Sequence, residues 1–124
     1  MKTCILFPGQ GAQSIGMGKD LYDADADVRR LFEEASDAAK VNLVDLIFSG
    51  TEEELKQTRN AQLALALVDT AASAVLKKHG VSADGAAGFS LGEWAALHEA
   101  GVVPFALMIS LVAERGRLMD EAGQ

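Results

Sequence analysis

The segment Gly88-Phe89-Ser90-Leu91-Gly92 constrains the fold of this chain more than any other. It follows a short run of small and apolar residues (85–89) that is typical of a buried strand, and it precedes a helical pattern over 91–100. A serine between two glycines at such a junction fits a sharp, strained strand-to-helix turn, where larger side chains at Gly88 and Gly92 would clash. Because strands and helices alternate along the rest of the chain as well, we expect an α/β fold: a parallel sheet flanked by helices.

A second apolar run, residues 3–7, is also predicted to be a buried strand, and it ends in the loop Phe7-Pro8-Gly9-Gln10-Gly11-Ala12-Gln13. Loops at the carboxyl ends of parallel strands share one edge of a sheet, so this loop and the Ser90 turn should lie together. Gly9 and Gly11 would let the backbone approach closely. One backbone N–H from the Gln10 region and one from Leu91 would then form an oxyanion hole for a reaction at Ser90.

Nucleotide-binding patterns do not fit the first loop. A dinucleotide fingerprint would need a third glycine where Ser14 stands, and a phosphate-binding loop would need a lysine after Gly16, where the chain has Met17. The Gly-rich loop is therefore predicted to serve the serine rather than a phosphate.

Helical periodicity predicts three longer helices, over residues 25–40, 61–79 and from Pro104 to about Ala122. Between the first two lie a short apolar segment, 43–48, and the pattern Thr51-Glu52-Glu53-Glu54, which is typical of a capping box. The helix over 61–79 is rich in Ala and Leu and is expected to be largely buried, with Lys77, Lys78 and His79 at its carboxyl end.

Composition narrows the possible partners. A chain of 124 residues is one domain's worth, and its formal net charge of −7 argues against nucleic acid or an anionic membrane surface. No run approaches the roughly 20 apolar residues of a membrane helix, and the N-terminal apolar run is too short for a signal peptide, so we expect a cytoplasmic protein. The single cysteine, Cys4, is expected to be buried and inert. One cysteine and two distant histidines give no spacing for a metal site.

Four separated motifs resemble the malonyl-CoA:acyl carrier protein transacylase family, which includes the acyltransferase domains of fatty acid and polyketide synthases. They are FPGQGAQ (7–13), AQLALA (61–66), GFSLGEWAAL (88–97) and LVAERGRLM (111–119). The resemblance covers the whole chain with the motifs in the family's order, and it implies the large, α/β-hydrolase-like subdomain of such enzymes.

The resemblance also implies a reaction and its residues. Ser90 would take a malonyl group from malonyl-CoA and pass it to the phosphopantetheine thiol of an acyl carrier protein, with no bound cofactor. The backbone amides of Gln10 and Leu91 would form the oxyanion hole, Arg115 would bind the malonyl carboxylate, and Gln62 would line the pocket. An arginine suits this task because its planar fork pairs both carboxylate oxygens, whereas Arg117 is expected to be a surface charge.

The chain departs from the family pattern in three ways. Phe89 stands where the family usually has histidine, and Ala106-Leu107 replaces two commonly acidic residues, which indicates either a contact surface or altered core packing. The family's catalytic histidine lies downstream of the serine, and neither His79 nor His98 is placed to act for it. We therefore expect residues 1–124 to be the N-terminal portion of the large subdomain, with the ferredoxin-like small subdomain absent.

A missing C-terminal half or a second chain would then supply the base, and the isolated chain is expected to be inactive in transfer and either poorly soluble or oligomeric.

Two alternatives remain open at the level of sequence. One is an acyl hydrolase of the same fold, which Arg115 disfavours and Phe89 permits; the other is a non-catalytic binding or assembly module. The motifs do not distinguish fatty acid from polyketide synthesis, or malonyl from branched donors. Lys77-Lys78 and Arg117 are candidate basic contacts for an acidic carrier protein.

Overall fold

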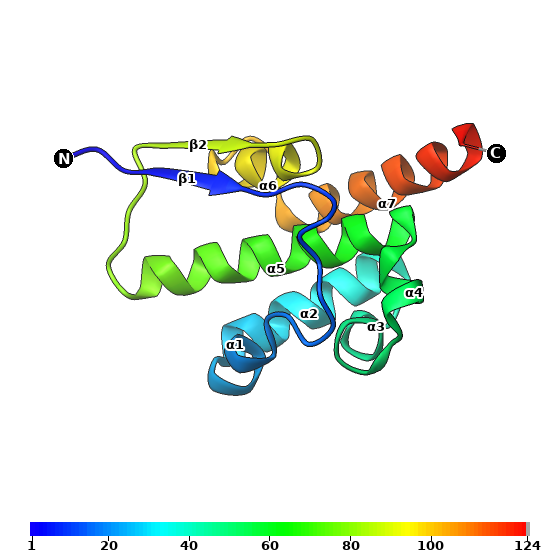
Figure 1. Ribbon diagram of the computed structural model, residues 1–124. Coiled ribbons are helices and arrows are strands. Elements are labelled where there is room, and N and C mark those ends of the chain that lie inside the picture. Colours follow the sequence, from blue (N-terminus) through cyan, green and yellow to red (C-terminus); the bar gives the residue numbers. More distant parts are fainter. Residues whose placement is uncertain (124) are drawn as a thin grey trace.

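A computed structural model of the chain describes residues 1–123 and shows a small sheet lying beside a body of helices (Figure 1). In chain order the elements are β1 (Cys4–Phe7), α1 (Lys19–Ala24), α2 (Ala26–Ala39), α3 (Leu43–Ser49), α4 (Glu52–Lys56), α5 (Thr58–Lys78), β2 (Gly85–Gly88), α6 (Gly92–Glu99) and α7 (Phe105–Ala122). This arrangement agrees with the predicted α/β class, and the predicted strands and longer helices have boundaries within three residues of those in the structure. The short helix α1 was not predicted, and the segment 43–48, predicted only as apolar, is helical.

The sheet brings together two segments far apart in the sequence. β1 and β2 pair in parallel, with Cys4 opposite Gly85 and Phe7 opposite Gly88. The pairing continues past the strand ends, because the Phe89 amide donates to the Phe7 carbonyl at 3.1 Å. Since α6 packs against both strands, the carboxyl ends of β1 and β2 meet the start of α6 at one edge of the molecule.

The long helix α5 is the centre of the helical body, where it packs against α2, α6 and α7. Its apolar residues face every direction over the segment 61–67, which is buried throughout. Tyr22, Phe32 and Phe48 add an aromatic cluster under α2, with ring centroids 5.1 to 5.4 Å apart. This packing makes α5 a rigid support for side chains that point from it toward the sheet.

Local sequence signals explain the short helices between α2 and α5. The segment 43–48 is helical and begins after Asn42, whose side chain accepts a hydrogen bond from the Asp45 amide. At the start of α4, Thr51 and Glu54 form the predicted capping box with both reciprocal bonds present. Short polar side chains at helix starts satisfy amides that the helix itself leaves free.

One face of the sheet is open, so the predictions that both strands and Cys4 are buried were wrong. Alternate residues of a strand point to opposite sides, so Cys4 and Leu6 share a face, while Phe7 points the other way and is buried. Cys4 is exposed rather than buried, and Leu6 keeps 75% of its surface accessible. Residues 1–123 contribute no element that covers this face.

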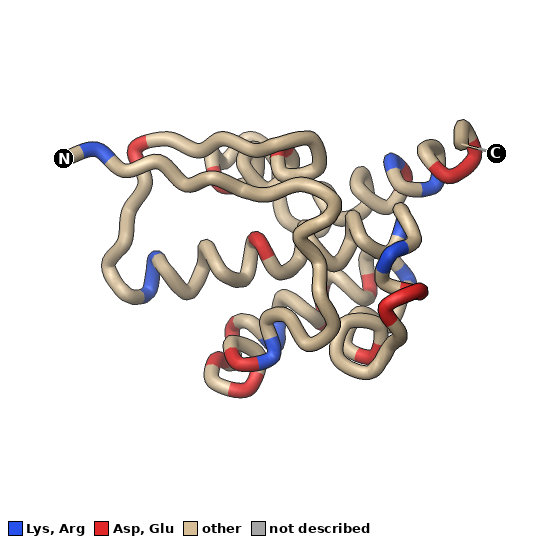
Figure 2. Tube along the Cα trace, in the orientation of Figure 1, with Lys and Arg blue, Asp and Glu red and all other residues tan. Residues whose placement is uncertain are grey.

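Charged residues avoid the sheet. Figure 2 shows acidic and basic residues along α1, α4 and the end of α7, whereas β1 and β2 carry none. Within residues 1–123, none of the helices is both long and apolar enough to cross a bilayer.

Candidate functional site

Ser90 occupies a left-handed backbone conformation at the turn between β2 and α6. Its φ angle is +52°, a region that residues other than glycine seldom adopt. The turn is held by two backbone hydrogen bonds: the Gly92 amide donates to the Phe89 carbonyl at 2.9 Å, and the Glu93 amide donates to the Ser90 carbonyl at 3.1 Å. Strain of this kind costs on the order of 1 kcal/mol or more and persists only where the surroundings enforce it.

Gly88 and Gly92 enforce the turn through close backbone contacts. A Cβ atom added at Gly88 would lie 2.0 Å from the Gly92 carbonyl carbon, and one added at Gly92 would lie 2.2 Å from the Phe7 oxygen. Both distances are far inside van der Waals contact, so neither position accommodates a side chain. The glycines thus bring β1, β2 and α6 together directly beneath Ser90.

The loop after β1 lies against this turn, as the shared sheet edge predicts. A Cβ atom at Gly9 would lie 2.6 Å from the Phe89 carbonyl oxygen, so the two loops are in direct contact. Gln13 Oε1 accepts a hydrogen bond from the Gly11 amide at 2.8 Å, and Gln10 Nε2 donates to Thr58 Oγ1 at 3.3 Å. The side-chain carboxamide of Gln13 therefore holds the loop together, and that of Gln10 attaches the loop to the start of α5.

Two backbone amides at this edge remain available to a ligand. Within residues 1–123, the N–H groups of Gln10 and Leu91 donate to no other protein atom. Leu91 directly follows Ser90 and is the N-cap residue of α6, and Gln10 belongs to the adjoining loop. Free donors beside a serine are what an oxyanion needs in acyl transfer.

Arg115 reaches the serine from α7. Its Nη2 donates to Ser90 Oγ at 3.3 Å and its Nη1 donates to Gln62 Oε1 at 2.7 Å. Gln62 projects from α5 and is fully buried. A serine, a guanidinium and a carboxamide from three separate segments therefore meet at one point. Arg117, two residues further, is exposed and pairs with Glu114 and Glu121 on its own helix, as expected for a surface charge.

Neither histidine lies beside the serine. His98 is directed to the far end of α6, where its Nδ1 is 2.9 Å from the Val103 carbonyl oxygen and its ring meets Phe105 edge-on. His79 forms the carboxyl cap of α5 and is exposed. Both placements agree with the sequence interpretation. Within residues 1–123, no imidazole is hydrogen-bonded to Ser90.

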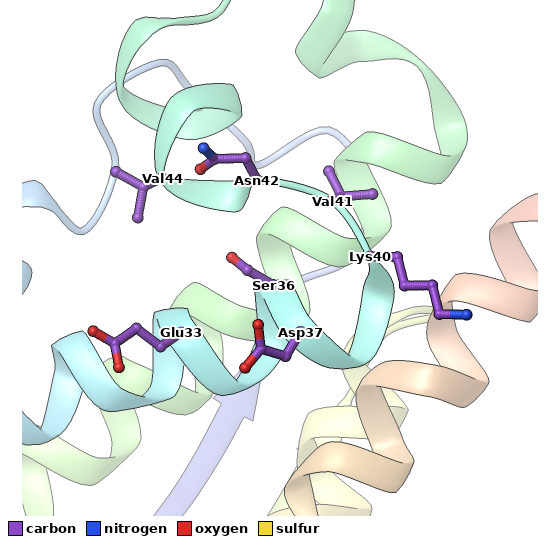
Figure 3. A pocket seen from close by; sticks show the side chains of 7 residues that line it. All are labelled: Glu33, Ser36, Asp37, Lys40, Val41, Asn42 and Val44. Carbon is purple, nitrogen blue, oxygen red and sulfur yellow. The ribbon is translucent and has the colours of Figure 1, made fainter.

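An apolar hollow of about 480 Å³ lies next to Arg115. Its lining residues come from α6 and α7: Trp94, Leu111, Glu114, Arg115, Leu118, Met119 and Ala122. A hollow of about 570 Å³ between α2 and α3 holds no candidate residue, and its charged side chains point apart rather than toward a common centre (Figure 3). The hollow beside Arg115 is therefore the better candidate for a binding site.

Phe89 and Leu107 lie at the surface. Phe89 has 76% of its surface exposed beside Ser90, and Leu107 has 51% exposed on α7. Ala106 is half-buried and Leu107 is exposed, so at Leu107 the structure favours a contact surface over altered core packing.

Two features of the site region escaped the sequence analysis. Met119 Sδ accepts a hydrogen bond from Gln62 Nε2 at 3.1 Å, which no sequence pattern signals. Asp69 is a buried carboxyl on α5, and burial raises its pKa to about 7. Its Oδ2 has no hydrogen-bond partner within the described residues. The sequence did signal Asp69, because it is the only acidic residue in the apolar stretch 61–76. Nowhere in residues 1–123 do three His, Cys, Asp or Glu side chains gather as a metal site would require.

Comparison with known proteins agrees with this geometry. Residues 4–124 match the model of the acyl transferase domain family. The malonyl CoA-acyl carrier protein transacylase of Bacillus subtilis (strain 168) is 46% identical over 121 residues, which cover 98% of this chain and 38% of that protein.

Solved structures give the same result. A malonyl-transacylase in complex with a type II PKS acyl-carrier protein superimposes with a TM-score of 0.92 at 42% identity, over 98% of this chain and 40% of that one. The MCAT of Streptococcus pneumoniae gives a TM-score of 0.94 at 41% identity, over 98% and 39%. The chain thus spans about two fifths of the length of these relatives, and residues 1–123 contain no second, ferredoxin-like subdomain. By the match of almost its whole length, this chain belongs to the acyl transferase domain family.

Proposed function

We propose that Ser90 is the nucleophile of a malonyl transfer from malonyl-CoA to the phosphopantetheine thiol of an acyl carrier protein. The observation that carries the proposal is the contact of Arg115 with a strained, exposed serine hydroxyl: Nη2 lies 3.3 Å from Oγ. A guanidinium at this distance is placed to pair with the free carboxylate of a malonyl group whose thioester carbonyl lies over the serine. The relatives named as malonyl transacylases support the choice of acyl group.

The reaction would proceed in two exchanges. Ser90 Oγ attacks the thioester carbonyl, the carbon–sulfur bond breaks, and coenzyme A leaves with the serine proton, which a general base transfers. The carrier-protein thiol then attacks the serine ester, and Ser90 recovers its proton as it leaves. In both steps the carbonyl oxygen becomes an oxyanion, which the Gln10 and Leu91 amides stabilise. The reaction needs no bound cofactor.

Neither His79 nor His98 contacts Ser90, so neither is proposed as the general base. We propose that residues 1–124 are the N-terminal portion of the acyltransferase large subdomain, and that further residues or a second chain supply the base. The relatives, which are about two and a half times as long, favour this view. The isolated 1–124 chain would accordingly be inactive in transfer.

The carrier protein would dock on a surface other than the predicted basic residues. Lys77 pairs with Glu99, Lys78 with Asp25 and Asp27, and Arg117 with its helix neighbours. Paired cations attract an acidic partner weakly, so these residues do not form a free basic patch.

We place the reaction in the cytoplasm, where carrier-protein chemistry of fatty acid or polyketide synthesis occurs.

Hydrolysis by the same fold is the second candidate. Phe89, exposed beside Ser90, is the observation that keeps it open, because an apolar ring replaces the family's usual histidine next to the proposed nucleophile. Arg115 opposes it, since a hydrolase has no need for a carboxylate partner. A purely structural module would gain nothing from the strain at Ser90.

Intact-mass measurement after brief exposure to malonyl-CoA tests the proposal on the protein as its cells make it. We expect a malonyl adduct that Ser90→Ala abolishes and that added carrier protein removes by transfer. Loss of the adduct to water at the same rate with and without carrier protein would support the hydrolase instead. Absence of any adduct on the wild-type protein, or an adduct that survives in Ser90→Ala, would contradict the proposal.

A further inference from the structure

Met119 stands at the end of a row of hydrogen-bonded side chains that leads to the reactive serine. Its Sδ accepts from Gln62 Nε2 at 3.1 Å, Gln62 Oε1 accepts from Arg115 Nη1 at 2.7 Å, and Arg115 Nη2 donates to Ser90 Oγ at 3.3 Å. The row starts on α7, crosses to α5 and returns to α7 before it reaches the turn at Ser90. Each link is a separate, directional contact.

The carboxamide of Gln62 serves Arg115 in only one of its two orientations. A guanidinium carries donors alone, so it needs the amide oxygen, and an amide turned by 180° would present two more donors to it. With the oxygen toward Arg115, the amino group must face the opposite side. Gln62 is fully buried, so this amino group has no access to solvent. The acceptor on that side is the thioether of Met119.

Met119 is also held in place for this contact. It lies one turn beyond Arg115 on α7, so both side chains project from the same face of that helix. The thioether lines the apolar hollow together with Trp94 and Leu118, and 42% of its surface is exposed. An ordinary apolar side chain would fill the same wall, but only a residue with an acceptor satisfies the Gln62 amino group.

We propose that Met119 is a positioning residue: its sulfur fixes the amide orientation of Gln62, which in turn holds the Arg115 guanidinium toward the acyl carboxylate. This inference rests on the proposed role of Arg115. It predicts that removing the sulfur weakens recognition of the carboxylate without changing the shape of the pocket. Restoring an acceptor at the same place should restore recognition.

Three variants separate the sulfur from the bulk of the side chain. Met119→Leu removes the acceptor and keeps an apolar residue of similar volume, whereas Met119→Gln supplies a carbonyl oxygen at similar length. Met108→Leu is the matched control, because Met108 is a fully buried methionine of the same helix that packs in the hydrophobic core. It reports what the loss of a thioether does to packing alone.

The first readout is the ratio of malonyl to acetyl adduct on Ser90 when the complete native protein competes for both coenzyme A thioesters. We expect Met119→Leu to lower this ratio about fivefold, the size of one lost neutral hydrogen bond. Met119→Gln and Met108→Leu should stay within about twofold of the wild type. An unchanged ratio in Met119→Leu, or an equal fall in Met108→Leu, would overturn the proposal.

The second readout does not depend on activity. The side-chain amide protons of Gln62, followed by ¹⁵N NMR, should exchange slowly with water in the wild type and in Met119→Gln, and at least about tenfold faster in Met119→Leu. Equal exchange rates in Met119→Leu and the wild type would reject the positioning role. If the wild-type protein takes neither acyl group, the proposed function fails by itself, and the exchange rates still decide the role of Met119.

Discussion

The helical body (α1 to α5 and α7) and the sheet edge (residues 4–13 and 85–92) differ in how completely their side chains are buried and in how strained their backbone is. In the helical body, Phe32, Leu67 and Ile109 are fully buried, and side chains cap the starts of α2, α3 and α4. At the sheet edge, Ser90 is strained, two amides are free, and large apolar side chains such as Leu6 and Phe89 remain 75% or more exposed. The helical body therefore has a closely packed interior, whereas the sheet edge leaves its largest apolar side chains uncovered within residues 1–123.

This difference separates the region that stabilises the fold from the region that holds Ser90. Buried apolar area stabilises the helical body, which can therefore hold Gln62 rigidly at the site. The sheet edge places Ser90 on a strained turn that requires glycine at positions 88 and 92. Substitutions in the two regions should therefore differ in their effects on stability and on acylation.

Gly88→Ala should destabilise the protein by more than about 4 kcal/mol, because the added Cβ would lie 2.0 Å from the Gly92 backbone and neither segment has room to move. Gly85→Ala, at the other end of β2, is the control: a Cβ there has no atom within 4 Å, so the change should be nearly neutral. Urea unfolding monitored by circular dichroism measures both. Equal stability of the two variants would contradict the close packing of the turn.

Phe32→Ala should cost about 3–5 kcal/mol of unfolding free energy, since it empties a fully buried position among aromatic rings. Phe89→Ala should cost less than about 0.5 kcal/mol in the same chain, because its ring is 76% exposed. Thermal and urea unfolding of the 1–124 chain provide the comparison. A large loss in Phe89→Ala would show that the sheet edge is buried in solution, for instance between two copies.

Asp69 should make stability fall as pH rises. Burial raises the carboxyl pKa from 3.8 to about 7, so the folded state prefers the protonated acid. The contribution of this carboxyl to the free energy of unfolding is fully present below pH 3.8. It declines as pH rises from about 4 toward 7 and is lost above pH 7. Asp69→Asn should remove this slope and be more stable than the wild type at pH 8 by about 1–3 kcal/mol. Unfolding measured between pH 4 and 8 tests this, and parallel curves for the two proteins would contradict it.

Thr51→Ala should cost about 1 kcal/mol, because it removes the hydroxyl that accepts from the Glu54 amide in the capping box. Thr51→Ser keeps the hydroxyl and should cost only a few tenths of a kcal/mol. Neither change should alter acylation of Ser90, because α4 belongs to the helical body. An equal loss in both variants would show that the methyl group, not the cap, matters at this position.

Sequence reasoning succeeded where a short pattern determines a local structure. The capping box at Thr51 and the turn at Ser90 each follow from a few neighbouring residues, and the structure has both. The meeting of Ser90, Gln62 and Arg115 was expected only through the family resemblance, because residues 25 to 53 positions apart leave no mark of contact in a single sequence.

The failures have physical reasons as well. Cys4 lies in an apolar run that resembles a buried strand, yet burial depends on whether another element covers that face, and none within residues 1–123 does. The Met119 sulfur contacts the Gln62 carboxamide on another helix, and the Asp69 carboxyl is buried by the residues packed around it. Tertiary contacts decide all three positions.

The most direct test of the account is the acyl preference of the complete native protein after replacement of Arg115. Arg115→Ala should lower labelling of Ser90 by malonyl-CoA at least tenfold while leaving labelling by acetyl-CoA within about twofold, because the lost guanidinium pairs only with the free carboxylate. Arg117→Ala, an exposed arginine two residues away, should change neither. Equal loss of both acyl groups in Arg115→Ala, or undiminished malonyl labelling, would contradict the claim that Arg115 reads the carboxylate beside Ser90.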